Sequence, residues 1–526
     1  MGGSASAPGS SPRRPVLAIA LDASDWNLVE SWARAGILPN LRRLYEAGAR
    51  GRLHSPVDWL AGTPWPSFYT GRYPPDHGFL FHLQWRAATM RHERPSPEWL
   101  PMSPFYRRFG DHGKRVVAID VPITYEPEPI EGIEITSWST HDKIAPTASH
   151  PPELMGWVNR HIGTEPIKIE EGGVQKVRAL LELRDDMIES ARRQAALCET
   201  LMARERWDFF IIGIGAAHRA GHKLWDRSSA LPMTPDEGQE YDLALRDVYV
   251  ACDQAIGRIA AAAGPDVTLL CFALHGMETN TSRFDLVPPM LDLVLQDLGV
   301  PAANSRRRHD SALRRLRSAV PVEWRNAIKQ RLPEAAQDRL SRYWRGVDER
   351  DWSTTPAFSL MGDLQALVQI NLKGREARGI VEPGREYDTL CDRITEGLMT
   401  FRDADTGEPF IDQIGRGDRL YPDAEYSVGI PDLVIRWNDR PARFHRAVVS
   451  ESLGTVPWPC PGQPLAGRSG HHGPPGWLLA TGAHIPPGMD FGSASVWDLN
   501  ATIHGLVGVP RPEPRIGTDI ELLRHD

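Results

Sequence analysis

Hydrophobic residues in this chain fall into short, nearly continuous runs that alternate with longer stretches of helical periodicity. Residues 16–21 form the first such run, which predicts a strand buried on both faces. Residues 26–48 follow with helical spacing, and Gly36 and Pro39 interrupt that helix. A second strand is predicted at residues 115–122.

Two further units run in the order helix, then strand. Helical spacing over 184–207 leads into the apolar run 208–215, and the same spacing over 241–264 leads into 266–274. Shorter strands and a last helix are predicted further along, at 364–372, 430–437, 476–482 and 496–510. Alternating helices and apolar strands predict an α/β fold with a central, largely parallel sheet between helices.

One long segment breaks this rhythm and suggests the division of the chain. Residues 283–350 are helical in pattern and very rich in Arg, so we interpret them as a helical cap insertion. They form either a solvated charged face or a lid or partner surface. The remaining predicted parts are a disordered tail, 1–15, and one catalytic domain made of 16–282 and 351–520.

Composition narrows the class of protein. The 526 residues include 41% hydrophobic residues and 17 Trp, enough for a large core. The net charge of −8 gives no general reason to bind nucleic acid. Five scattered cysteines without a CxxC pair favour a reducing compartment. No apolar run is long enough to span a membrane. We therefore expect a cytoplasmic protein without a membrane or nucleic-acid partner.

Ionisable residues follow directly after several predicted strands. Ligands bind outside the carboxyl ends of the strands in such sheets, so these residues are expected to meet at one site. They are Asp22, His218, His222, His275 and His472. Each alone has a structural explanation: an Asp there can cap a helix, and a single His is more often solvated or packed. Together they predict a site for one or two divalent ions, and imidazole-rich ligation suits Zn²⁺, with Mn²⁺ or Fe as alternatives.

A series of motifs in fixed order resembles the alkaline phosphatase superfamily, and in particular its type I phosphodiesterase/nucleotide pyrophosphatase branch. The motifs are "LDASDW", "GILPNLRRLYEAGARGRL", "WPSFYTGRYPPDHG", "HRAGHKLW", "LHGM" and "GHHGPPG". The resemblance implies an alkaline phosphatase-like sandwich, a metal-dependent phosphoric ester hydrolase and a small anionic phosphorylated substrate. It further implies that Asp22 and His275 bind one metal ion, while His222 and His472 bind the other, with His218.

Three positions depart from the family pattern. Leu274 stands where the family has an Asp before the His-Gly pair, and His218 replaces another Asp. Both changes reduce the negative charge of the site, so a single bound ion is a real alternative. The family's nucleophile position corresponds to Ala61, which carries no hydroxyl.

Two sources of the nucleophile therefore stay open. Thr63 is the nearest hydroxyl and would be activated by the metal, with the alternative that it only caps the following helix. A metal-bound hydroxide is the other source, because the pKa of bound water falls to about 7. Asp58 is a remote third candidate.

Weaker signals concern the substrate and the type of activity. Asn371, Lys373 and Arg375 are suited to bind an anionic group, or to make surface salt bridges. Trp138, close to His141, is suited to stack on a leaving group, or to pack in the core. We predict hydrolysis of phosphodiester or nucleotide pyrophosphate-type bonds. The alternatives are sulfatase or phosphonate hydrolase activity, or a non-catalytic protein that binds a ligand or partner.

Overall fold

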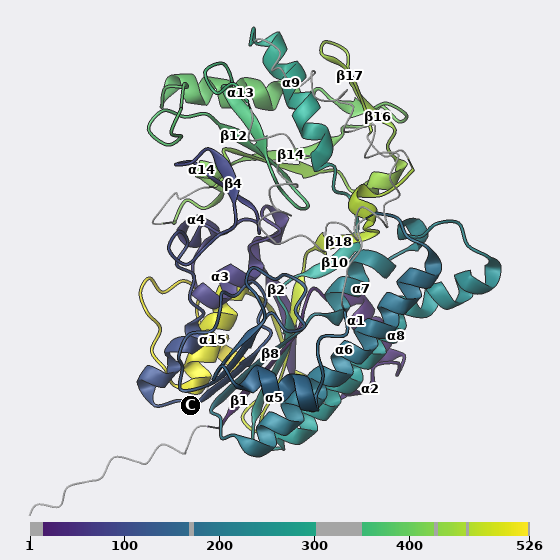
Figure 1. The fold of residues 1–526 in the computed structure, drawn as a ribbon, viewed down its shortest axis with the longest axis vertical. Helices are drawn as coiled ribbons and strands as arrows, with labels where there is room; N and C mark the ends of the chain where they lie inside the picture. Colours follow the sequence, from purple (N-terminus) through teal and green to yellow (C-terminus); the bar gives the residue numbers. More distant parts are fainter. Residues whose placement is uncertain (1–13, 168–172, 301–349, 425–429, 459–461, 524–526) are drawn as a thin grey trace, which may run out of the picture.

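The computed structural model describes residues 14–167, 173–300, 350–424, 430–458 and 462–523. The molecule has two lobes, with the larger one at the bottom of Figure 1. The Arg-rich residues 301–349, most of the predicted insertion, lie outside the described residues. Among the helices of the described ranges, none is long and apolar enough to cross a membrane.

The larger lobe is built on a nine-stranded sheet in the order β20-β2-β19-β9-β1-β8-β5-β6-β7. Its strands are β1 (Val16–Leu21), β2 (Ala49–His54), β5 (Val116–Ile119), β6 (Gly132–Thr136), β7 (Ala148–His150), β8 (Phe209–Ile214), β9 (Thr268–Ala273), β19 (Gly476–Thr481) and β20 (Asp490–Ser495). The central strands β9, β1, β8, β5 and β6 are parallel, whereas β19 and β7 run antiparallel to their neighbours. The predicted α/β fold with a largely parallel sheet is confirmed.

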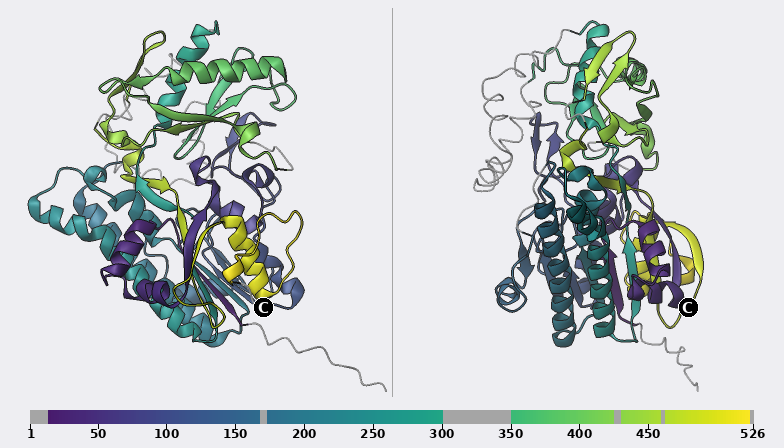
Figure 2. Two further views of the ribbon diagram at one scale, coloured as in Figure 1. Left: turned by 180° about the vertical axis from the view of Figure 1, so that it is seen from behind. Right: turned by 90° about the vertical axis from the view of Figure 1, so that its right-hand side faces the viewer.

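Helices cover both faces of this sheet, as Figure 2 shows. One face carries α1 (Trp26–Arg34), α2 (Pro39–Ala47), α5 (Leu154–His161), α6 (Val177–Arg204), α7 (Ala216–Leu224) and α8 (Pro235–Ala263), and the other carries α3 (Pro64–Thr70) and α15 (Val496–Val507). Alternate residues of β1 enter the two hydrophobic cores: Leu17 lies in one and Ala18 in the other. The continuous apolar run of this strand is therefore explained by burial on both faces.

The smaller lobe has its own hydrophobic core. It contains the antiparallel sheet β11-β12-β15-β14 and the small sheet β13-β16-β17. Its elements are α9 (Val287–Asp297), β11 (Ala357–Leu360), β12 (Ala366–Ile370), α13 (Arg385–Met399), β13 (Arg402–Asp403), β14 (Ile411–Arg416), α14 (Gly417–Leu420), β15 (Leu433–Trp437), β16 (Ala447–Ser450) and β17 (Gly454–Pro457). Helix α9, at the start of the predicted insertion, is part of this core.

Short elements lie between the two lobes. They are α4 (Pro74–His77), the hairpin of β3 (Gln84–Arg86) and β4 (Arg91–Glu93), and the antiparallel pair of β10 (Gly276–Thr279) and β18 (Gly470–Gly473). The β10–β18 pair places Met277 opposite His472. Two segments that are far apart in the sequence therefore meet beside the carboxyl ends of the parallel strands.

Candidate metal centre

Helix α7 supplies two histidines from one face. His218 and His222 are four residues apart, so their side chains lie one above the other along the helix. Both side chains are almost completely buried. The helix lies close to β10, and a Cβ at Gly221 would come within 2.7 Å of the Met277 side chain. A glycine at position 221 permits this approach and so brings α7 against the strand pair that carries His472.

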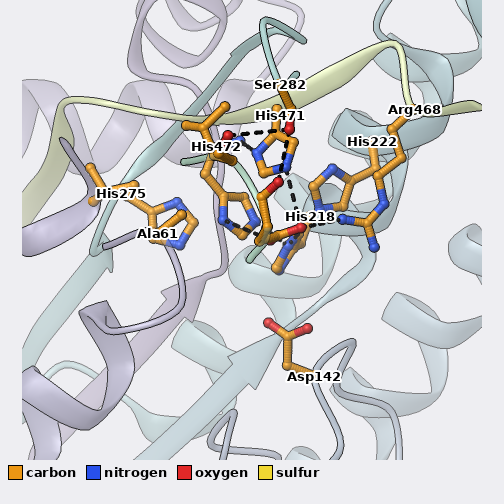
Figure 3. A network of polar contacts seen from close by, with 12 residues as sticks. Ala61, Asp142, His218, His222, His275, Ser282, Arg468, His471 and His472 are labelled. Carbon is orange, nitrogen blue, oxygen red and sulfur yellow. Dashed lines mark hydrogen bonds and ion pairs between the residues drawn. The ribbon is translucent and has the colours of Figure 1, made fainter. Parts of the chain in front are cut away.

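Three imidazoles converge on one point. The Nε2 atom of His218 lies 3.1 Å from Nε2 of His222 and 2.8 Å from Nε2 of His472. The three rings come from α7 and β18, and Figure 3 shows them together in the centre of a polar network. The structure thus brings together three of the five residues that the sequence predicts as metal ligands.

The other ring nitrogens of His218 and His222 have acceptor partners. His218 donates its Nδ1–H to Oδ2 of Asp22 at 2.6 Å, and His222 donates its Nδ1–H to the carbonyl of Gly470 at 3.0 Å. A carboxylate or carbonyl at Nδ1 leaves Nε2 as the free ligand atom, the arrangement usual for metal-binding histidines. Two such Nε2 lone pairs 3.1 Å apart repel each other unless a proton or a metal ion lies between them. The residues therefore fit a bound cation.

Protonation differs among the three histidines. Burial by itself lowers the pKa of His218, but the adjacent Asp22 carboxylate raises that pKa above its ordinary value. Burial lowers the pKa of His222 and of His472 well below the ordinary value, and neighbouring positive charges add to the effect. The pKa shifts therefore favour the neutral form of His222 and His472, which can bind a metal ion, and the charged form of His218 beside Asp22.

Each carboxylate oxygen of Asp22 accepts one hydrogen bond. Its Oδ1 accepts from the indole Nε1–H of Trp65 at 2.8 Å, and its Oδ2 accepts from His218. The positive charge and the hydrogen bond of His218 outweigh burial and lower the pKa of Asp22 to about 2. Asp22 thus stays ionised and orients His218.

A second acidic group approaches from the smaller lobe. Asp363, in the loop between β11 and β12, lies 3.3 Å from Nε2 of His471 and 3.1 Å from the guanidinium of Arg468. Its Oδ2 is 4.0 Å from Nδ1 of His472, an atom without a hydrogen-bond partner among the described residues. Asp363, His471 and His472 form one group of potential ligands, and His141, His218 and His222 form another.

His275 and the predicted nucleophile positions lie around this centre. His275 donates its Nδ1–H to the carbonyl of Gly276 at 3.1 Å, and its ring lies 4.5 Å from that of His472. Leu274 is buried in a hydrophobic core, and Ala61 packs with Val57 and Leu364. These apolar side chains occupy two of the positions at which the sequence departs from the family pattern.

Thr63 is placed by the structure at the N-cap of α3. Its side chain is completely buried, and its hydroxyl donates to the carbonyl of Leu60 at 2.8 Å. The hydroxyl makes no capping hydrogen bond to the helix. The hydroxyl hydrogen of Thr63 is already donated to the carbonyl of Leu60. The role of Thr63 as a nucleophile stays a prediction.

The predicted substrate-binding residues have partners of their own. The Asn371 amide donates to two main-chain carbonyls, and the Trp138 ring is buried in the core. Arg375 forms a two-bond ion pair with Asp432. Arg375 also lines a cavity of about 480 Å³, together with Trp85, Trp99, Met361 and Gln369. No described contact joins these three residues to the histidine cluster, so their substrate role stays a prediction.

Sequence reasoning did not assign Asp363, Arg468 or His471 to the site. His471 directly precedes His472 in the chain and Arg468 lies four residues before it, and this proximity was a usable signal. No sequence signal pointed to Asp363, because a single Asp between two strands of another sheet has many structural explanations.

Comparisons with known proteins identify the family. The model of the type I phosphodiesterase/nucleotide pyrophosphatase family matches residues 16–445. The chain belongs to this family. Its members are phosphoric ester hydrolases that depend on metal ions, typically Zn²⁺, and the resemblance read from the motifs is confirmed. No curated protein matches the chain by sequence.

Solved structures with a similar course of the chain share little sequence with it. An inactive variant of murine ectonucleotide pyrophosphatase/phosphodiesterase 5, in complex with AMP, has 10% identity and a TM-score of 0.47 over 96% of this chain and 97% of that one. Phosphonoacetate hydrolase from Sinorhizobium meliloti, in complex with phosphonoformate, has 13% identity and a TM-score of 0.49 over 95% of this chain and 96% of that one.

Proposed function

We propose that this protein hydrolyses phosphoric esters, of the phosphodiester or nucleotide pyrophosphate type, with a divalent metal ion held by His218, His222 and His472. The observation that carries the proposal is the convergence of three Nε2 atoms, since His218 lies 3.1 Å from His222 and 2.8 Å from His472. Imidazole ligands favour Zn²⁺ over Mg²⁺, which prefers oxygen. A divalent ion held by these residues would polarise a phosphoryl oxygen and stabilise the charge that develops on it.

The protonation of the ligands supports this assignment. His222 and His472 are neutral, so their nitrogens accept a metal ion without first losing a proton. Asp22 raises the pKa of His218, so a metal ion held by this residue would compete with a proton for its nitrogen. Metal affinity therefore falls as the pH falls, and binding releases a proton that can be measured in weakly buffered solution.

A water molecule serves as the nucleophile in this proposal. Ala61 has no hydroxyl, and the hydroxyl of Thr63 is buried and donates within its own turn. Thr63 acting directly is the alternative, and a Thr63 variant separates the two. Thr63→Val preserves the shape of the side chain and replaces the hydroxyl by a methyl group.

The substrate in this proposal is a small anionic phosphorylated molecule in the cytoplasm. The net charge of the chain is −8, so attraction of an anion depends on local positive charge. Arg468, which is partly exposed, supplies such a charge beside the histidines (Figure 3). Its guanidinium can bind phosphate oxygens while its bond to Asp363 holds it in place.

Hydrolysis of bis-aryl and mono-aryl phosphates, measured together with the metal content, tests the proposal. We expect wild-type protein to hydrolyse the diester, chelation to abolish activity and Zn²⁺ to restore it. His222→Ala should be inactive, whereas His161→Ala, on an exposed face of α5, serves as the matched control and should retain full activity. Thr63→Val should retain activity, and its inactivity would identify Thr63 as the nucleophile.

Ala61 and Leu274 favour a second candidate, a ligand-binding protein without turnover. That protein would lack the family's nucleophile and one of its carboxylate ligands. Wild-type protein with a fully occupied metal site and no activity on any phosphoric ester would support this candidate and refute the hydrolase.

A further inference from the structure

A fourth histidine, His141, is held over the metal centre by a clamped loop. Residues 137–143 follow β6, and this loop is fixed at its base by Asp120, which accepts from the backbone N–H groups of Trp138 and Ser139 at 2.7–3.0 Å. Ser137 adopts a left-handed backbone conformation with φ of 56°. That conformation costs of order 1–3 kcal/mol, so it persists only where the surrounding contacts impose it.

The other end of the loop is fixed to the helix that carries the ligands. The guanidinium of Arg219, on α7, donates to the carbonyl of Thr140 at 2.8 Å. The Lys143 ammonium donates to the carbonyl of Trp138 at 3.2 Å and pairs with Glu165. A Cβ at position 215, the N-cap of α7, would lie 3.2 Å from the backbone nitrogen of His141, so Gly215 allows the loop to approach the helix closely.

This construction brings the His141 side chain to the ligand nitrogens. One ring nitrogen of each of His141, His218 and His222 lies within 4.8 Å of the others. The His141 ring is 4.4 Å from the ring of His218 and 5.4 Å from that of His222. Its side chain is only 8% exposed. A loop held at both ends thus places a buried imidazole next to the convergent nitrogens, the support that a metal ligand requires.

The position expected for a second metal ion offers few donors. Both oxygens of Asp22 are hydrogen bonded, to Trp65 and to His218. Leu274 and Ala61 are apolar and buried. His275 is the one imidazole expected at that position among the described residues. Its Nδ1 is bound to the carbonyl of Gly276, so its Nε2 is the nitrogen that remains for a metal ion. Asp22 and His275 would together supply only two protein ligands at this position, fewer than the three or four that tightly bound divalent ions have in protein sites.

We propose that the centre binds a single transition-metal ion through imidazole nitrogens alone, with His141 joining His218, His222 and His472 as a ligand and His275 outside the set. The inference rests on the proposed function for its metal ion, but it concerns binding and holds whether or not the protein turns over a substrate. The family pattern has two metal sites with several carboxylate ligands, whereas the proposed centre is a single site with neutral imidazole ligands.

The ligand type determines which ions the centre selects. Neutral imidazoles suit Zn²⁺, Cu²⁺, Ni²⁺ and Co²⁺, whereas Mg²⁺, Ca²⁺ and Mn²⁺ favour carboxylate and carbonyl oxygens. We therefore expect millimolar Mg²⁺ or Mn²⁺ to displace bound Zn²⁺ poorly. Efficient displacement by either ion would contradict an all-imidazole ligand set.

Titration of chelator-treated protein with Zn²⁺, in competition with a chromophoric chelator, tests the inference without an activity assay. Wild-type protein should bind one equivalent tightly. His141→Ala should lose at least about tenfold in affinity, the lower end of the cost of removing even an outer partner of a metal ligand. His275→Ala, the matched control from the same cluster, should stay within about twofold of wild type, because an imidazole outside the ligand set leaves the coordination unchanged.

Three results would overturn the inference: two tightly bound equivalents, unchanged affinity in His141→Ala, or an equal loss in His275→Ala. Thermal unfolding of each metal-free variant checks that it folds. The visible absorption of Co²⁺-loaded protein gives a second readout, since His141→Asn should change the spectrum and His275→Asn should not. One tightly bound equivalent in an inactive protein would refute the proposed hydrolase and leave this inference standing.

Discussion

The Asp22–His218 hydrogen bond offers the sharpest test of how the metal centre is organised. Asp22 is the only carboxylate that contacts a convergent histidine within hydrogen-bond distance in the described chain, at 2.6 Å. Its other oxygen accepts from Trp65 at 2.8 Å, and both Asp22 and His218 have side chains about 1% exposed. We predict that Asp22→Asn, which hardly changes the shape of the side chain, disrupts the centre.

The reason lies in which atoms can donate. The Trp65 indole nitrogen is only a donor, so the asparagine side chain of this variant must turn its carbonyl oxygen to Trp65. Its amide NH₂ then faces Nδ1 of His218 and donates to it. That hydrogen bond forces the His218 proton onto Nε2, the atom that must be free to bind the metal ion.

The size of the effect follows from the role of the carboxylate. Loss of an outer partner of a metal ligand reduces affinity by about 10- to 100-fold, which corresponds to about 1.4–2.7 kcal/mol. A competition titration with Zn²⁺ near pH 7 measures this change. Asp25→Asn is the matched control, since Asp25 caps α1 through Leu28 and Asn caps a helix equally well.

Two outcomes would refute the reasoning. Unchanged Zn²⁺ affinity in Asp22→Asn would mean that Asp22 does not set the tautomer of His218. Loss of one of two bound equivalents would mean that Asp22 is itself a ligand, as the family resemblance implies.

Three further predictions concern single positions. Thr63→Val should lower the free energy of unfolding by about 1 kcal/mol, the usual value of one lost hydrogen bond, and leave the turnover rate within about twofold; urea denaturation and diester hydrolysis measure both. Burial lowers the pKa of His77 to about 3 from 6.5, so its stabilising effect is complete above pH 6.5 and is lost as the pH falls toward 3. The titration of His77 alone should lower the free energy of unfolding by about 2 kcal/mol at pH 5 relative to pH 8. His77→Asn should therefore reduce the pH dependence of the free energy of unfolding in this range. Glu134→Gln should cost about 3 kcal/mol or more, because it removes the buried carboxylate that pairs with the buried Arg107 guanidinium and leaves only the exposed Glu128 as an acidic partner; equal stability of variant and wild type in urea would contradict this.

The alternation of apolar strands and helices was sufficient to predict the larger lobe. The strand at residues 16–21 and the break in the first helix at Gly36 and Pro39 have their predicted form. A strand buried on both faces can be predicted from sequence because it requires a continuous apolar run. A helix break can be predicted because Gly and Pro act on the local backbone.

The contacts between segments that are distant in the sequence could not be predicted from local patterns. The hydrogen bond from Trp65 to Asp22 joins residues 43 positions apart, and no local pattern specifies it. Asp363 enters the site from another sheet, and the loop of His141 is fixed by Asp120 and Arg219 from other elements. Whether Asp22 binds a metal ion or orients a histidine depends on these contacts, so motif spacing alone could not decide it.

The most direct test of the account is the hydrolysis of a bis-aryl phosphate by chelator-treated protein as Zn²⁺ is added back. The account predicts that the rate rises in proportion to the metal bound and reaches its plateau when the convergent histidines are saturated. A fully loaded protein that releases no product from this or any other phosphoric ester would contradict it.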